Sequence, residues 1–182
     1  MRPAPTLMVC AWLLAALAGC GRQDPAAPSL RSAATPPATA SPVRAEPAVT
    51  EVDTARIVGA DGEPQNWLSH GRSYSEQRYS PLAAIDTGNV ARLGLSWHFD
   101  FPTNRGMEAT PIVVDGRMYA TSTWSKVYAF DARNGALLWH HDPEVPPQWA
   151  VHLCCDAVNR GVAAWGDRVF VGTLDGRLQA LD

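Results

Sequence analysis

The chain has 182 residues, of which 15 are Lys or Arg and 18 are Asp or Glu, so its net charge is −3. The charged residues are scattered, and neither a basic stripe nor an Arg-rich helix occurs, which leaves nucleic-acid binding without support. One continuous apolar stretch, at residues 7–17, is too short to span a membrane as a stable helix.

The first twenty residues have the order of a secretion signal. Arg2 precedes the apolar stretch, and small residues lead up to Cys20. The run LAGC at residues 17–20 resembles the bacterial lipobox, in which the cysteine is acylated and becomes the first mature residue. We therefore expect a lipoprotein-type signal peptide over residues 1–19 and lipidation of Cys20, with ordinary cleavage that leaves this cysteine unmodified as the alternative. The protein is then expected in the periplasm, anchored by lipid to a bacterial membrane, the outer membrane in preference to the inner.

Residues 20–51 are rich in Pro, Ala, Ser and Thr and contain few large apolar side chains. Such a segment cannot bury enough apolar surface to offset the entropy of folding, so we expect a disordered tether. The ordered domain is accordingly predicted over residues 52–182.

Short strands joined by tight turns dominate this domain. Residues 110–120 form an apolar run, an Asp-Gly turn at 115–116 and a second strand, and residues 126–131 continue into a third. An Asn-Gly turn at 134–135 leads to a fourth strand. The stretch 86–93 alone has a helical period, so the fold class is predicted as all-β.

A repeat appears when the chain is shifted by 51 residues. The run RMY at 117–119 then falls on RVF at 168–170, and AFD at 129–131 falls on ALD at 180–182. A period near 50 with four short strands per unit indicates the blades of a β-propeller. Since such blades cannot bury their faces alone, we expect the first blades of a propeller that is incomplete in this chain.

Two of the four cysteines, Cys154 and Cys155, are adjacent. Consecutive Cα atoms lie about 3.8 Å apart, whereas disulfides prefer about 4.4–6.8 Å, so a bond between neighbours closes a strained eight-membered ring. Cys10 lies in the signal and Cys20 is expected to carry lipid, so in an oxidising compartment the adjacent cysteines have only each other as intramolecular partners. We predict this disulfide, with two reduced cysteines buried as small apolar residues as the alternative.

The pattern AxDxxNGxxxW at residues 129–139 resembles the tryptophan-docking repeat of eight-bladed quinoprotein propellers, which usually has Thr where this chain has Asn134. Further runs follow the same family in order and rough spacing: NW at 66–67, QRYSPL at 77–82, NRGMEATP at 104–111 and CCDAVNRG at 154–161. Together, residues 66–182 resemble the N-terminal part of pyrroloquinoline quinone (PQQ)-dependent alcohol dehydrogenases, most closely the quinohaemoprotein ethanol dehydrogenases.

The resemblance implies cofactor-binding roles for four residues. The disulfide of Cys154 and Cys155 would form a flat apolar platform against one face of PQQ, and Glu108 would hydrogen-bond the edge of the cofactor. Arg160 would reach its oxygens, as suits a guanidinium facing paired carboxylate oxygens. The alternatives are a solvated strand-end carboxylate at Glu108 and an ion pair between Arg160 and Asp156.

The family oxidises primary alcohols to aldehydes by hydride transfer to PQQ, aided by a carboxylate base and a Ca²⁺ ion. The resemblance therefore implies a small alcohol substrate and a cytochrome or quinone electron acceptor. The base and the Ca²⁺ ligands are expected in later blades, and haem c in a C-terminal domain, because no Cys-x-x-Cys-His occurs here. We expect no catalytic residue or metal ligand in this chain and no activity of the chain alone. The alternative is a non-catalytic lipoprotein propeller, like the scaffold of the outer-membrane barrel assembly machinery, which shares the tryptophan repeat and a lipobox.

Other polar residues are predicted to be structural. His140 and His141 stand beside Asp142, yet adjacent residues of a strand point to opposite faces, which favours a structural rim over a metal site. Asp156 and Asn159 are expected to be turn residues that hydrogen-bond local backbone.

Overall fold

The computed structural model describes residues 50–182. The predicted signal peptide, the lipidation of Cys20 and nearly all of the predicted tether lie outside the described residues. Within residues 50–182, no helix has the length and apolar character needed to cross a membrane.

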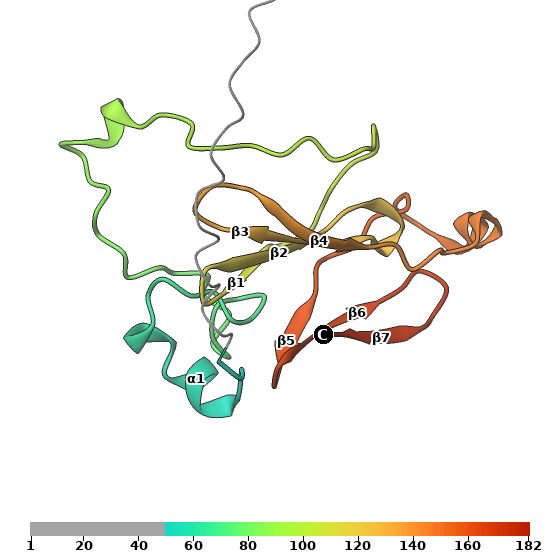
Figure 1. Ribbon diagram of the computed structural model, residues 1–182, viewed down its shortest axis with the longest axis horizontal. Helices are drawn as coiled ribbons and strands as arrows, with labels where there is room; N and C mark the ends of the chain where they lie inside the picture. Colours follow the sequence, from blue (N-terminus) through green and yellow to red (C-terminus); the bar gives the residue numbers. More distant parts are fainter. Residues whose placement is uncertain (1–49) are drawn as a thin grey trace, which may run out of the picture. The chain divides into compact units, whose positions relative to one another are not determined.

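Two antiparallel sheets form the described domain (Figure 1). The first sheet has four strands in the order β1-β2-β3-β4, and the second has three in the order β5-β6-β7, so each strand pairs with the next along the chain. The strands are β1 (Ile112–Val114), β2 (Arg117–Thr121), β3 (Val127–Asp131), β4 (Leu137–His141), β5 (Ala163–Trp165), β6 (Arg168–Gly172) and β7 (Leu178–Leu181). This meander confirms the predicted all-β class.

The turn between β1 and β2 is the predicted Asp-Gly hairpin. Val114 pairs with Arg117, which leaves a two-residue loop, and both loop residues have positive φ, 50° at Asp115 and 82° at Gly116. Asp-Gly is a preferred pair for such a loop, because its backbone twist matches that of the flanking strands.

The two sheets follow the predicted repeat. Strands β5, β6 and β7 each begin 51 residues after β1, β2 and β3, respectively. The first sheet is therefore a complete four-stranded blade, and the second consists of the corresponding first three strands of the next blade.

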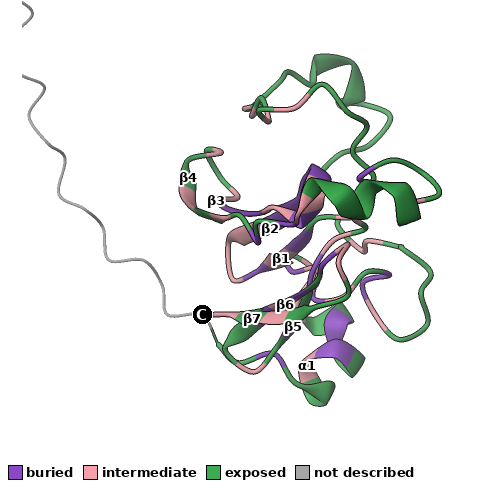
Figure 2. Ribbon diagram, turned by 90° about the vertical axis from the view of Figure 1, so that its right-hand side faces the viewer, coloured by how far each residue is buried: buried purple, intermediate pink, exposed green. Residues whose placement is uncertain are grey.

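Apolar side chains cover both faces of the first sheet. Along β3, Val127 and Ala129 belong to a cluster that also contains residues of β5 and β6, whereas Tyr128 and Phe130 pack on the other face against Phe99 and other apolar residues. Figure 2 shows buried residues along β2 and β3 of the first sheet. Burial on both faces is what a blade between two neighbours requires.

A short helix that the sequence did not predict, α1 (Thr54–Val58), precedes the sheets. The Asp53 side chain caps it by accepting a hydrogen bond from the backbone N–H of Arg56 at 2.8 Å. The Arg56 guanidinium also pairs with Glu63 and with Asp115 in the β1–β2 turn. Five residues are too few for a helical period to be visible in the sequence.

The remaining helical segments of residues 50–182 are short 3₁₀ helices: η1 (Ala60–Gly62), η2 (Val90–Arg92), η3 (Thr123–Ser125) and η4 (Pro147–His152). The second of these lies inside the stretch 86–93 that has a helical period, so that period corresponds to a short 3₁₀ turn.

Candidate functional site

The two adjacent cysteines lie in the loop that leads from η4 to β5. Both side chains are exposed, and their sulfur atoms are 2.8 Å apart as thiols without a covalent bond. The exposure of both side chains contradicts the alternative of two buried cysteines. The disulfide itself stays a prediction.

Glu108 and Arg160 come from segments that lie side by side. The Thr110 N–H donates to the Arg160 carbonyl at 3.2 Å, and the Arg160 guanidinium lies 3.1 Å from the Glu108 carboxylate. The Arg160 side chain is 71% exposed and that of Glu108 is 43% exposed, so both remain accessible to a ligand. The alternative pairing of Arg160 with Asp156 is wrong, because the partners are Glu108 for Arg160 and Arg105 for Asp156.

The cysteines and this ion pair form one electrostatic group. The hydrogen bond to the Cys154 thiol is the main reason why the pKa of the Cys155 thiol is raised. The Glu108 carboxylate raises the pKa of Cys155 further, and the Arg160 guanidinium lowers it. The Cys155 sulfur thus lies close enough to this carboxylate and this guanidinium for both charges to act on it. The structure thus brings together all four residues for which the resemblance implies a cofactor-binding role.

Side chains within the loop set its course. Asp156 has a φ of 72°, and its carboxylate accepts from the N–H of Ala157 at 2.8 Å. The side-chain oxygen Oδ1 of Asn159 accepts from the backbone N–H of Gly161 at 3.0 Å, which confirms the predicted local turn roles. The Asn159 amide also donates to the carbonyl of Gly172 at 2.9 Å, so the loop is tied to β6 as well.

Arg105 is a contact residue that the sequence reasoning missed. It forms an ion pair with Asp156, and its guanidinium carbon lies 5.8 Å from the centre of the Trp124 ring. The backbone N–H of Trp124 in turn donates to the backbone carbonyl of Ala157 at 2.9 Å. A signal was present, because Arg105 and Asp156 are 51 residues apart and therefore occupy equivalent positions in successive repeats.

The histidines have structural partners. The His140 ring stacks on Tyr128 with ring centres 5.9 Å apart, and His141 Nε2 lies 2.9 Å from the side-chain oxygen of Gln179. In residues 50–182, no group of three or more His, Cys, Asp or Glu residues is placed to hold a metal ion.

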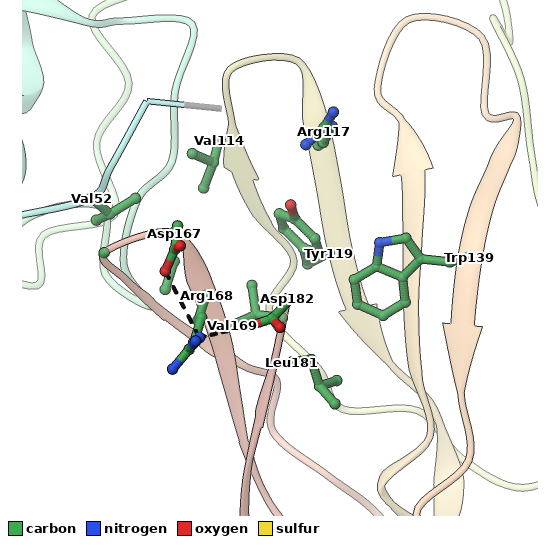
Figure 3. Close-up of a pocket in the computed structure, with 12 residues that line it drawn as sticks. Val52, Val114, Arg117, Tyr119, Trp139, Asp167, Arg168, Val169, Leu181 and Asp182 are labelled. Atoms are coloured by element: carbon green, nitrogen blue, oxygen red, sulfur yellow. Dashed lines mark hydrogen bonds and ion pairs between the residues drawn. The ribbon is translucent and has the colours of Figure 1, made fainter. Parts of the chain in front are cut away.

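A cleft between the two sheets is lined by other residues (Figure 3). Its wall includes Tyr119, whose ring centre lies 5.9 Å from that of Trp139, and Leu181 of β7. Arg168 in the same wall pairs with Asp182 at 2.7 Å. None of the four candidate cofactor residues lines this cleft, which lies where the tryptophan of one blade meets the next blade.

Residues 67–182 match the family model described as "Glucose/ethanol/alcohol dehydrogenase, beta-propeller domain". The chain belongs to this PQQ β-propeller family. The match covers both sheets and all four residues of the candidate site.

Individual relatives of the chain are also named as alcohol dehydrogenases. The chain is 56% identical over 142 residues to the quinohemoprotein alcohol dehydrogenase ADH-IIG of Pseudomonas putida, covering 78% of this chain and 20% of that protein. It is 60% identical over 121 residues to the dehydrogenase subunit of a quinone alcohol dehydrogenase of Gluconobacter oxydans, covering 66% of this chain and 16% of the relative. The solved structure of the Pseudomonas putida ADHIIG enzyme superposes with a TM-score of 0.72 at 57% identity, over 74% of this chain and 20% of that one. The chain thus spans about a fifth of the length of these relatives.

Proposed function

We propose that this chain corresponds to the N-terminal part of a PQQ-dependent alcohol dehydrogenase that oxidises primary alcohols to aldehydes. The observation that carries the proposal is the convergence of Cys154, Cys155, Glu108 and Arg160 at one exposed place, from two segments about 50 residues apart. The curated relatives named above are alcohol dehydrogenases, and another, from Thauera butanivorans, is named "1-butanol dehydrogenase (cytochrome c)".

The donor set fits the chemistry of the cofactor. PQQ is a planar quinone that carries carboxylates, and an exposed guanidinium is the protein group best suited to grip paired carboxylate oxygens. The adjacent sulfur atoms offer a polarisable surface without charge, suited to contact with a flat ring. Arg160 would hold a cofactor carboxylate, and Glu108 would accept a hydrogen bond at the cofactor edge while keeping Arg160 in place.

When bound, PQQ supplies the hydride acceptor for alcohol oxidation. The residues of this chain would bind and orient the cofactor, and the carboxylate base and Ca²⁺ ligands would come from other parts of the full-length protein. Electrons would pass to a cytochrome or quinone acceptor, and haem c would be carried by a further domain.

The proposal places the enzyme in the periplasm, with a lipid anchor at Cys20. Its support is the order of charged, apolar and small residues over positions 1–20. Mass spectrometry of the mature N-terminal peptide tests this part, because an acylated Cys20 as the first residue supports the anchor and an unmodified N-terminus contradicts it.

The first experiment is a dye-linked assay of the full-length protein, purified and reconstituted with PQQ and Ca²⁺, with ethanol and longer primary alcohols as substrates. Turnover that depends on added PQQ supports the dehydrogenase. Absence of both turnover and bound quinone contradicts it and favours a lipoprotein scaffold, for which the lipobox is the supporting observation.

A further inference from the structure

A side chain outside the four candidate residues, Arg105, also links the cysteine loop to the preceding repeat. Arg105 belongs to the segment that also carries Glu108, and its guanidinium pairs with the carboxylate of Asp156, the residue directly after Cys155. The candidate site therefore has two ion pairs between the same two segments, one through Arg160 and one through Arg105.

Arg105 also has an aromatic neighbour that is fixed to the same loop. Its guanidinium carbon lies 5.8 Å from the centre of the Trp124 ring, within the usual range of a cation–π contact. The backbone of Trp124 binds the loop directly, through its N–H and the carbonyl of Ala157 at 2.9 Å. The guanidinium thus contacts the Asp156 carboxylate, directly after the cysteines, and the ring of a residue whose backbone is bonded to the same loop.

We propose that Arg105 is a positioning residue that fixes the loop of Cys154 and Cys155 beside Glu108 by bridging Asp156 and Trp124. The consequence for PQQ binding rests on the proposed function, whereas the positioning of the loop does not. Arg105 is suited to this role because a planar guanidinium donates to a carboxylate and contacts an aromatic ring at the same time, which a lysine ammonium does less well.

The backbone at Asp156 explains why such a restraint is needed. A φ of 72° is uncommon for a residue other than glycine, and this residue holds the position with its own carboxylate on the Ala157 N–H. The same carboxylate oxygen receives Arg105. Oδ1 of Asp156 thus accepts both the hydrogen bond of the local turn and the bond from Arg105. Loss of Arg105 therefore removes a restraint on the loop next to the cysteines.

The test uses the full-length protein with three variants: R105Q, which removes the charge, R105K, which keeps it, and R133Q as a matched control. Arg133 is also exposed and also paired with an aspartate, Asp131, but lies in the turn after β3. Hydrogen–deuterium exchange of residues 153–160 is measured without PQQ, and the dissociation constant of PQQ is measured by equilibrium dialysis.

We expect R105Q to accelerate exchange in residues 153–160 and to weaken PQQ binding about tenfold, which corresponds to roughly 1.4 kcal/mol. R105K should lie between R105Q and the parent protein, and R133Q should match the parent in both measurements. Unchanged exchange in the R105Q loop overturns the proposal, whatever the affinity for PQQ.

D156N covers the case that R105Q fails to fold, because asparagine tolerates positive φ and keeps the local turn while removing the charge. It should reproduce the accelerated exchange, and exchange equal to that of the parent overturns the proposal. If the parent itself binds no PQQ, the proposed function fails, and the exchange data alone decide the role of Arg105.

Discussion

Among the glycines with positive φ, Gly161 is the one whose replacement by alanine should disrupt the candidate site most. Gly161 has a φ of 119°, and a Cβ added there would lie 2.8 Å from the backbone carbonyl oxygen of Thr110. This oxygen cannot easily withdraw, because Thr110 also donates its N–H to the Arg160 carbonyl. The contact therefore pushes apart the two segments that bring Glu108 and Arg160 together.

The magnitude has two parts. A non-glycine residue in an unfavourable region of positive φ costs roughly 1–3 kcal/mol. The short contact with a backbone atom adds a cost of similar size, in the range of about 1–3 kcal/mol that overpacking usually causes. Gly176 is the matched control, because its φ is 83° and an added Cβ would have no atom within 4 Å, so G176A carries the backbone cost alone.

The assay compares the thermal midpoint of the protein without PQQ and the PQQ dissociation constant for G161A and G176A in the full-length protein. G161A should show the lower midpoint and PQQ binding weakened by at least about tenfold, since displacement of a binding group by about 1 Å has effects of this size or larger. G176A should bind PQQ as the parent does. Equal midpoints and equal affinities for the two variants would refute the steric reasoning.

Three further predictions test other parts of the molecule. Serine at both positions of the 154–155 pair should leave expression largely intact and sharply weaken PQQ retention, and unchanged retention measured by absorbance would remove the assigned role. F130A should destabilise the protein by about 3–5 kcal/mol because Phe130 is fully buried, whereas L178A at the 75% exposed Leu178 should change stability by less than about 0.5 kcal/mol in denaturant titration. The hydrogen bond from Arg56 lowers the pKa of Glu63 below its usual 4.5, so the ionised Glu63 stabilises the folded protein. This contribution is present above about pH 4.5 and is lost as the pH falls through the folded-state pKa. The thermal midpoint of E63Q should therefore fall less steeply than that of the parent below pH 4.5, and parallel curves would contradict the assignment.

The strands and turns were predictable because each depends on local sequence. The Asp-Gly turn at 115–116 specifies a hairpin by itself, and the shift of 51 residues carries the strands of the first blade onto the second. Helix α1 escaped prediction because five residues are too few for periodicity, and its main link to the sheets, between Arg56 and Asp115, joins residues 59 positions apart.

The members of the candidate site were predicted from resemblance, and their contacts were only partly predictable. Arg160 was given Asp156 as an alternative partner because the two are close in sequence, yet the structure pairs it with Glu108. The aspartate is taken by Arg105 instead. Proximity along a loop was a poor guide here, because the loop lies against a segment from the preceding repeat and finds its ionic partners there.

The repeat of 51 residues indicates which residues of the two loops meet, whereas closeness along the chain does not. Arg105 and Asp156 are 51 residues apart, and so are Thr110 and Gly161, which also meet. Both pairs therefore join equivalent positions of successive repeats, because loops at the same end of neighbouring blades lie beside one another. Each loop then presents one face to the loop before it and another to the loop after it. A candidate cofactor site at this end is assembled from corresponding loops, so changes at two such contacting positions should interact energetically. A double-mutant cycle between Arg105 and Asp156 should therefore give a coupling energy. The same cycle between Arg133 and Asp156 should give none.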